Sequence, residues 1–139
     1  MRRVPGYAIW LGHAGDARDS AALGAAAIAA VVDLALEEPP GAGTREQIYC
    51  RFPLLDGPGN PAWLLKAAVE TTACLIRSGA PTLVACGAGQ SRAPCIAAHA
   101  LGRIRGESPA AILIELAEAG LADVSPGLWA ESVAALAGD

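Results

Sequence analysis

The sequence predicts an α/β fold, with a central, mostly parallel sheet of four to five strands and helices on both faces. Two observations carry this expectation: short apolar segments of strand length alternate with longer helical patterns, and Gly- and Pro-rich loops separate them. Strands that alternate with helices are typical of a parallel sheet with crossover helices. A chain of 139 residues suits one core, so a single domain over 1–139 is expected.

The first third of the chain predicts two strands and one helix. Tyr7–Leu11 has the β-branched and aromatic content of a short strand. A helix is expected over Ala17–Ala26, with Asp16 as its N-cap. Ile28–Leu34 is a continuous apolar run, which is typical of a strand covered on both faces.

The middle of the chain repeats the pattern. Glu37–Gln47 is rich in Pro and Gly and is expected to be a loop. Ile48–Phe52 predicts a third strand, and Pro53–Asn60 a Gly- and Pro-rich loop. Pro61 then opens a helix in its first turn, and Gly79 closes it.

The last third predicts one strand and three helices. Thr82–Ala85 is expected to be a buried strand, followed by a loop over Cys86–Ser91. Helices are predicted from about Arg92 to Arg103, over Pro109–Ala119 and over Pro126–Ala137. In such a sheet ligands bind at the carboxyl ends of the strands, which draws attention to the loops at 53–60 and 86–91.

Composition limits the classes of partner. Ten Lys plus Arg against fourteen Asp plus Glu give a net charge of −4, which argues against broad, charge-driven binding to nucleic acid or anionic membranes. The longest apolar run, Ala21–Val32, is well short of the roughly 20 residues of a membrane helix. A cytoplasmic protein is expected. The four cysteines lack the spacing of a zinc site, so reduced thiols and no metal are expected; they are Cys50, Cys74, Cys86 and Cys95.

The segment from Thr82 to Pro94 carries the strongest chemical signal. It predicts a buried strand, a loop with two glycines and the start of a helix, an arrangement whose N–H groups and helix dipole bind anions. Cys86 stands at the mouth of this loop, where the same field favours its thiolate. Arg92 can grip two phosphate oxygens with its planar fork. The residues expected to bind phosphate are Gly87, Ala88, Gly89, Gln90, Ser91 and Arg92.

This Cys-x5-Arg pattern, set between strand and helix, resembles the signature of the cysteine-dependent protein phosphatases, most closely the dual-specificity branch. The segment Phe52–Pro58 is similar to the general-acid loop of that family, with Asp56 lying 30 positions before Cys86. The segments around Ile9–Gly12 and the Ser-Pro pairs at 108 and 125 also fall where the family has its opening strand and last two helices. The resemblance therefore covers nearly the whole chain and implies a protein-tyrosine-phosphatase-like fold.

The resemblance implies a two-step hydrolysis of phosphomonoesters without a metal or other cofactor. Cys86 would be the nucleophile, Arg92 would stabilise the phosphoryl oxygens, and Asp56 would serve as acid and then as base. The expected substrate is a phosphorylated protein or a small phosphomonoester: phosphotyrosine, with phosphoserine and phosphothreonine as further candidates.

Two positions depart from the family pattern. Ala85 stands where the family usually has His, and Ala93 where it usually has Ser or Thr. Both changes are expected to weaken the stabilisation of the thiolate and to slow the second step. Ser91 is a candidate for the missing hydroxyl. An alternative is therefore a catalytically weak or inactive module that binds phosphate or phosphopeptide.

Simpler roles remain open for each candidate. Cys86 could be a buried core thiol, Arg92 a surface residue at a helix start, and Asp56 an aspartate that caps a turn. The alternatives to Asp56 as the acid are Asp33, Glu37 and Glu38. Cys50 and Cys95 are candidate disulfide partners of an oxidised Cys86. His13 and His99 are expected to be structural. A sulfur transferase or arsenate reductase would leave Asp56 unexplained, and no Walker motif is present.

Overall fold

The computed structural model describes residues 1–41 and 44–138. Residues 42–43, within the loop expected at 37–47, and residue 139, the last of the expected domain, lie outside the described part.

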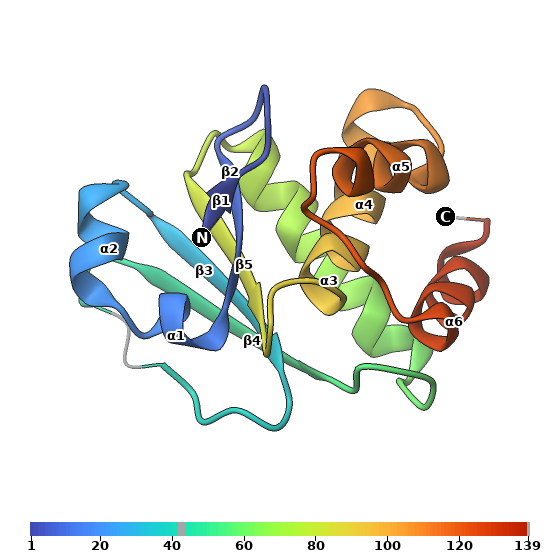
Figure 1. Ribbon diagram of the computed structural model, residues 1–139, viewed down its shortest axis with the longest axis horizontal. Coiled ribbons are helices and arrows are strands. Elements are labelled where there is room, and N and C mark those ends of the chain that lie inside the picture. Colours follow the sequence, from blue (N-terminus) through green and yellow to red (C-terminus); the bar gives the residue numbers. More distant parts are fainter. Residues whose placement is uncertain (42–43, 139) are drawn as a thin grey trace.

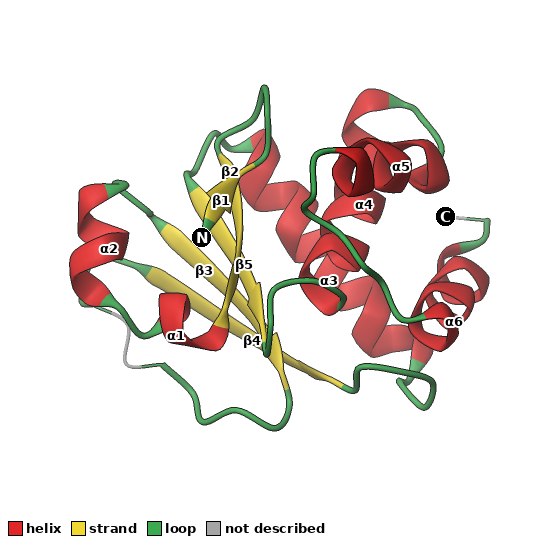
Figure 2. Cartoon of the chain, viewed as in Figure 1, coloured by secondary structure: helices red, strands yellow, loops and turns green. Residues whose placement is uncertain are grey.

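A five-stranded sheet lies at the centre of the molecule (Figure 2). Its strands follow the order β1-β2-β5-β3-β4, and all neighbours are parallel except β1, which is antiparallel to β2. The predicted α/β fold with a mostly parallel sheet is thus confirmed. The strands are β1 (Arg2–Arg3), β2 (Ile9–His13), β3 (Ala30–Ala35), β4 (Ile48–Leu54) and β5 (Thr82–Cys86).

Helices cover both faces of the sheet (Figure 1). Successive side chains of a strand point to opposite faces, so Leu83 packs in the cluster beneath the first two helices and Val84 in the larger core beneath the other four. The helices on the smaller side are α1 (Ala14–Ala17) and α2 (Ser20–Ala25). Those on the larger side are α3 (Ala62–Arg77), α4 (Arg92–Arg105), α5 (Pro109–Glu118) and α6 (Pro126–Leu136).

Helix α4 is the buried helix of the larger layer. Every residue from Arg92 to Gly102 is buried, and the helix ends at Gly106, whose φ of +66° suits a left-handed C-cap. It begins six residues after the central strand β5 ends at Cys86. The loop between them therefore lies at the carboxyl edge of the sheet, held between a buried strand and a buried helix.

The helix expected over 17–26 with Asp16 as its N-cap is wrong. His13 caps α1, because its Nδ1 accepts a hydrogen bond from Asp16 N (3.2 Å) while the Asp16 carboxylate accepts one from His13 N (3.0 Å). Asp19 caps the separate helix α2 by accepting from Ala22 N (3.1 Å). Two N-caps six residues apart, the first of them a reciprocal capping box, thus divide the segment into two short helices.

The other differences are one additional strand and several shifts at element ends. Strand β1 was not predicted, because two residues carry no periodicity. Strand β4 runs on to Leu54 through Pro53, which is tolerated because β4 is the edge strand of the sheet. Pro61 is the N-cap of α3 rather than part of its first turn. Within residues 1–41 and 44–138, no helix combines the length and apolar character needed to cross a membrane.

Candidate active site

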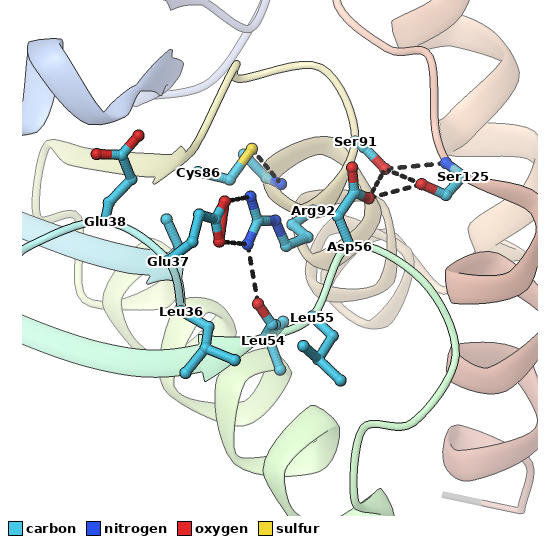
Figure 3. A network of polar contacts seen from close by, with 12 residues as sticks. Leu36, Glu37, Glu38, Leu54, Leu55, Asp56, Cys86, Ser91, Arg92 and Ser125 are labelled. Atoms are coloured by element: carbon cyan, nitrogen blue, oxygen red, sulfur yellow. Dashed lines mark hydrogen bonds and ion pairs between the residues drawn. The ribbon is translucent and has the colours of Figure 1, made fainter.

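The sulfur of Cys86 lies at the end of β5, against the first turn of α4. Cys86 is only 2% exposed, and its Sγ accepts a hydrogen bond from the backbone N of Ala93 (3.4 Å; Figure 3). Both the N–H group and the positive end of the α4 dipole favour negative charge on the sulfur. The cysteine expected to be the nucleophile therefore has a backbone donor and a helix N-terminus beside its sulfur.

The loop from 87 to 91 turns carbonyl groups outward. Gly87 O accepts a hydrogen bond from Ala14 N (3.5 Å), and Gln90 O accepts one from Asp123 N (2.7 Å). In a trans peptide the following N–H points opposite to the carbonyl, so the amides of Ala88 and Ser91 are directed away from these partners. An anion-binding loop requires this arrangement, because an inward carbonyl would repel the anion.

Both glycines of the loop are required by close approaches of neighbouring atoms. A Cβ at Gly89 would lie 2.8 Å from the carbonyl carbon and oxygen of Gly12, and the φ of Gly89 is +78°. A Cβ at Gly87 would lie 2.9 Å from Nη2 of Arg92 and from Oε1 of Glu37. Gly89 thus supplies the left-handed turn, whereas Gly87 makes room for the arginine.

Substituting Gly89 with alanine should lower the free energy of unfolding by about 2 kcal/mol or more, because the change adds both left-handed strain and a backbone clash. Urea denaturation measures this loss. Gly24→Ala is the matched control: Gly24 lies inside α2, has nothing within 4 Å of its added Cβ, and should be neutral or stabilising. Equal unfolding midpoints for Gly89→Ala and the wild type would contradict the strained turn.

Arg92, the first residue of α4, is only 4% exposed and is bound on two sides. Its Nη1 donates to the carbonyl of Leu54 (2.9 Å) and to Oε2 of Glu37 (2.7 Å), and its Nη2 forms an ion pair with the same carboxylate (Figure 3). These hydrogen bonds lower the pKa of Glu37 and raise the pKa of Arg92 from their ordinary values. The guanidinium is therefore charged and held in one orientation.

The third nitrogen of the guanidinium, Nε of Arg92, is buried and has no hydrogen-bond partner among the described residues. A buried donor without an acceptor is costly, and an anion beside it would remove that cost. The sequence analysis missed the role of Glu37, which it considered only as a rival acid. The available signal was its position just after β3, at the same edge of the parallel sheet as Arg92.

Asp56 follows strand β4, and its Oδ1 accepts hydrogen bonds from the hydroxyls of Ser91 and Ser125, both at 2.6 Å. The loop that carries it is fixed from within by Asn60, whose side chain bonds both N and O of Leu55 (2.8 and 3.0 Å). It is also fixed from outside, because the Glu131 carboxylate of α6 accepts from the backbone N of Gly59 (2.7 Å) and of Asn60 (2.6 Å).

These groups meet at a cavity of about 300 Å³. Cys86, Arg92 and Asp56 all line it, although they come from the end of a central strand, the start of a helix and a loop 30 residues upstream. Of the expected phosphate-binding residues, Gly87 and Gly89 are not among the lining residues, in accord with their packing roles. The full lining is Asp56, Cys86, Ala88, Gln90, Ser91, Arg92, Asp123, Val124, Ser125 and Pro126.

Comparison with solved structures shows which fold this chain has. Human DUSP28 is 24% identical and superposes with a TM-score of 0.79 over 96% of this chain and 93% of its own. DUSP15 is 24% identical, with a TM-score of 0.79 over 99% and 87% of the two chains. A mouse putative dual specificity phosphatase, complexed with zinc tungstate, is 23% identical, with a TM-score of 0.79 over 97% and 89%.

The chain has the dual-specificity phosphatase fold. No protein-family model and no curated protein matches the sequence. The resemblance to dual-specificity phosphatases inferred from the Cys-x5-Arg pattern is confirmed at the level of the fold by these solved structures.

In this phosphatase fold the rival acids have other partners. Asp33 accepts a hydrogen bond from the hydroxyl of Tyr49 and another from Ala35 N (3.1 Å). Glu37 binds Arg92, and Glu38 lies 3.5 Å from a terminal nitrogen of Arg18. None of the three rivals lines the cavity, whereas Asp56 does.

The Ser91 hydroxyl, a candidate substitute for the missing serine or threonine at 93, donates to Asp56 and lies 3.0 Å from the Ser125 hydroxyl. At position 93 itself the backbone N–H is what reaches the sulfur. Ala85 is fully buried in the core beneath α1 and α2. The phosphatase fold is thus kept here with a loop whose contact to the sulfur comes from the backbone.

Cys95 and His99 are buried and have structural surroundings. None of the four cysteines, all of them in the described part of the chain, forms a disulfide. Burial raises the pKa of Cys95 to about 11, so this thiol stays protonated at neutral pH. Burial also lowers the pKa of His99 to about 4, and the neutral ring stacks on Trp129 and bonds Ser132 (2.9 Å). Among the described residues, no group of three His, Cys, Asp or Glu side chains could hold a metal ion.

Proposed function

We propose that the protein hydrolyses phosphomonoesters of phosphoproteins through a phosphocysteine intermediate. Phosphotyrosine is the proposed substrate, with phosphoserine and phosphothreonine as further candidates. The observation that carries the proposal is that one cavity is lined by a sulfur beside a helix N-terminus, a buried arginine and a carboxylate. The phosphatase fold of the solved neighbours supports this assignment.

In the first step the Cys86 thiolate attacks phosphorus. The S–P bond forms as the P–O bond to the leaving group breaks, and Asp56 gives its proton to the departing oxygen. Arg92 and the loop amides stabilise the charge on the three equatorial oxygens. The orphaned Nε of Arg92 supplies a donor that the protein itself does not use.

In the second step water attacks the phosphocysteine. Asp56, now a carboxylate, accepts a proton from that water, the S–P bond breaks, and the thiolate leaves with inorganic phosphate as product. The Ala93 N–H stabilises the departing sulfur anion, but residue 93 has no hydroxyl to assist it. The second step is therefore proposed to be slow relative to the first.

The charges of the cavity favour a singly phosphorylated group. Arg92 is the only lysine or arginine among the lining residues, all of which belong to the described part of the chain, and it shares the lining with Asp56 and Asp123. Ligands with several phosphates need several cations, which this lining does not provide. We propose a phosphorylated protein or a small phosphomonoester as the partner and a cytoplasmic location, where such thiols stay reduced.

Rapid-mixing experiments with saturating p-nitrophenyl phosphate test this proposal. We expect a burst of about one equivalent of p-nitrophenol per enzyme, followed by slower steady turnover, because phosphocysteine forms faster than water cleaves it. Acid quenching should trap the phosphate on the protein, and peptide mapping should place it on Cys86. A linear time course with no trapped phosphate would contradict the two-step scheme.

A second candidate is a phosphate-binding module without turnover, favoured by Ala85 and Ala93. A solved neighbour described as a tyrosine phosphatase-like serine/threonine/tyrosine-interacting protein has the same fold at 18% identity. This alternative predicts that a phosphotyrosine peptide binds and is recovered intact. The positioned Asp56 favours the enzyme, because binding alone has no use for a proton donor.

A further inference from the structure

Helices α5 and α6 both begin at a Ser-Pro pair, but the two serine side chains make different hydrogen bonds. At the start of α5, Ser108 caps the helix in the usual way, since its Oγ accepts a hydrogen bond from Ala111 N (3.2 Å). At the start of α6, Ser125 holds the same N-cap position but makes no capping bond with its side chain. Its hydroxyl donates instead to Oδ1 of Asp56 (2.6 Å; Figure 3).

We infer that Ser125 is a positioning residue that orients Asp56 for proton transfer. The inference rests on the proposed function and deepens it. Ser125 lies 69 residues from Asp56 in sequence, and both residues line the cavity.

The contact is part of a closed set of hydrogen bonds. Ser91 Oγ donates to the same Oδ1 (2.6 Å) and accepts from the backbone N of Ser125 (2.9 Å). Ser125 therefore holds Asp56 directly and also holds Ser91, the second donor. Because both serines occupy Oδ1, the other oxygen, Oδ2, is the one that neither serine engages, and the geometry assigns it to the transferred proton.

Helix α6 supports the backbone beneath Asp56 as well. Glu131 accepts hydrogen bonds from the amides of Gly59 and Asn60, and Gly127 approaches Pro58 so closely that a Cβ would lie 2.8 Å from its ring. Asp56 itself is exposed and on a loop, so its side chain would sample several rotamers without these restraints. Ser125 is the member of this support that reaches the carboxylate.

A positioning role for the acid makes a specific kinetic prediction. Phenyl phosphate has a poor leaving group that needs a proton, whereas p-nitrophenolate leaves readily without one. Ser125→Ala should therefore lower kcat/KM for phenyl phosphate about tenfold and change that for p-nitrophenyl phosphate by at most about twofold. Ser125→Thr, which keeps the hydroxyl, should restore the wild-type ratio.

Two comparisons separate positioning from a structural effect. In an Asp56→Asn background, Ser125→Ala should change neither substrate further, because Ser125 acts through Asp56. Ser108→Ala is the matched control from the other Ser-Pro helix start: it should reduce thermal stability by the loss of a cap and leave the ratio of the two substrates unchanged. If Ser125→Ala folds poorly, Ser125→Gly removes the same hydroxyl and is acceptable at an N-cap.

Each outcome has a defined meaning. Equal losses on both substrates, or a full Ser125→Ala effect in the Asp56→Asn background, would overturn the positioning role while leaving the proposed hydrolysis intact. If the wild type hydrolyses neither substrate, the proposed function itself fails, and the positioning role fails with it. A selective loss on phenyl phosphate that disappears in the Asp56→Asn background supports the inference.

Discussion

Replacing Cys86 with serine should abolish hydrolysis of p-nitrophenyl phosphate, lowering kcat by at least about 10⁴-fold. The Ala93 N–H and the α4 dipole favour an anion at the position of Sγ, but a serine hydroxyl at neutral pH remains protonated and is a poor nucleophile. The smaller serine fits the space, and the cavity keeps Arg92 and the loop amides. Inorganic phosphate should therefore still bind, as titration calorimetry would measure.

The control for this experiment removes a different thiol. Cys74 is exposed on α3, and Cys74→Ser should leave both kcat and KM unchanged. Unimpaired turnover by Cys86→Ser would refute the covalent mechanism. Loss of phosphate binding together with turnover would instead indicate that the substitution had collapsed the loop.

Replacing Arg92 with lysine should lower kcat/KM by about 10²–10³-fold. Three hydrogen bonds from the terminal nitrogens fix the guanidinium between Glu37 and the Leu54 carbonyl, and a lysine ammonium cannot reproduce this planar fork. The positive charge is kept, so the loss would come from geometry. Steady-state kinetics and inhibition by tungstate, an oxyanion of similar shape to phosphate, measure the effect.

An exposed arginine provides the matched control. Arg18 pairs with Glu38 at 3.5 Å on the surface, and Arg18→Lys should have no measurable effect on kcat/KM or on tungstate inhibition. Thermal unfolding of both variants distinguishes loss of activity from loss of the folded state. A value of kcat/KM for Arg92→Lys within twofold of the wild type would show that the arginine does not contact the phosphoryl group.

Much of the fold could be predicted from sequence because its signals are local. The apolar runs that became β3 and β5, and the Ser-Pro entries of α5 and α6, are short patterns that nearby residues determine. The prediction for residues 14–25 was wrong because its caps give no clear local signal. His13 is an uncommon cap, and its reciprocal bonds with Asp16 became visible only in three dimensions.

The candidate site also contains residues that local patterns predict and residues that they do not. Cys86 and Arg92 share one loop, so their spacing could be interpreted directly, and Asp56 was found through a family resemblance. The contacts of Glu37 and Ser125 were missed, because they span 55 and 69 residues. Such pairs depend on which strand ends and helix starts meet at one edge of the sheet, and no local pattern encodes this.

The attachment of residues 55–60 to α6 has a consequence for the timing of the reaction. Enzymes whose acid travels on a hinged flap must wait for closure before chemistry and for reopening before release. A segment fastened by Asn60 and by both carboxylate oxygens of Glu131 is expected to stay in place through the reaction. A chemical step, and not a loop movement, would then limit the rate of turnover in this molecule.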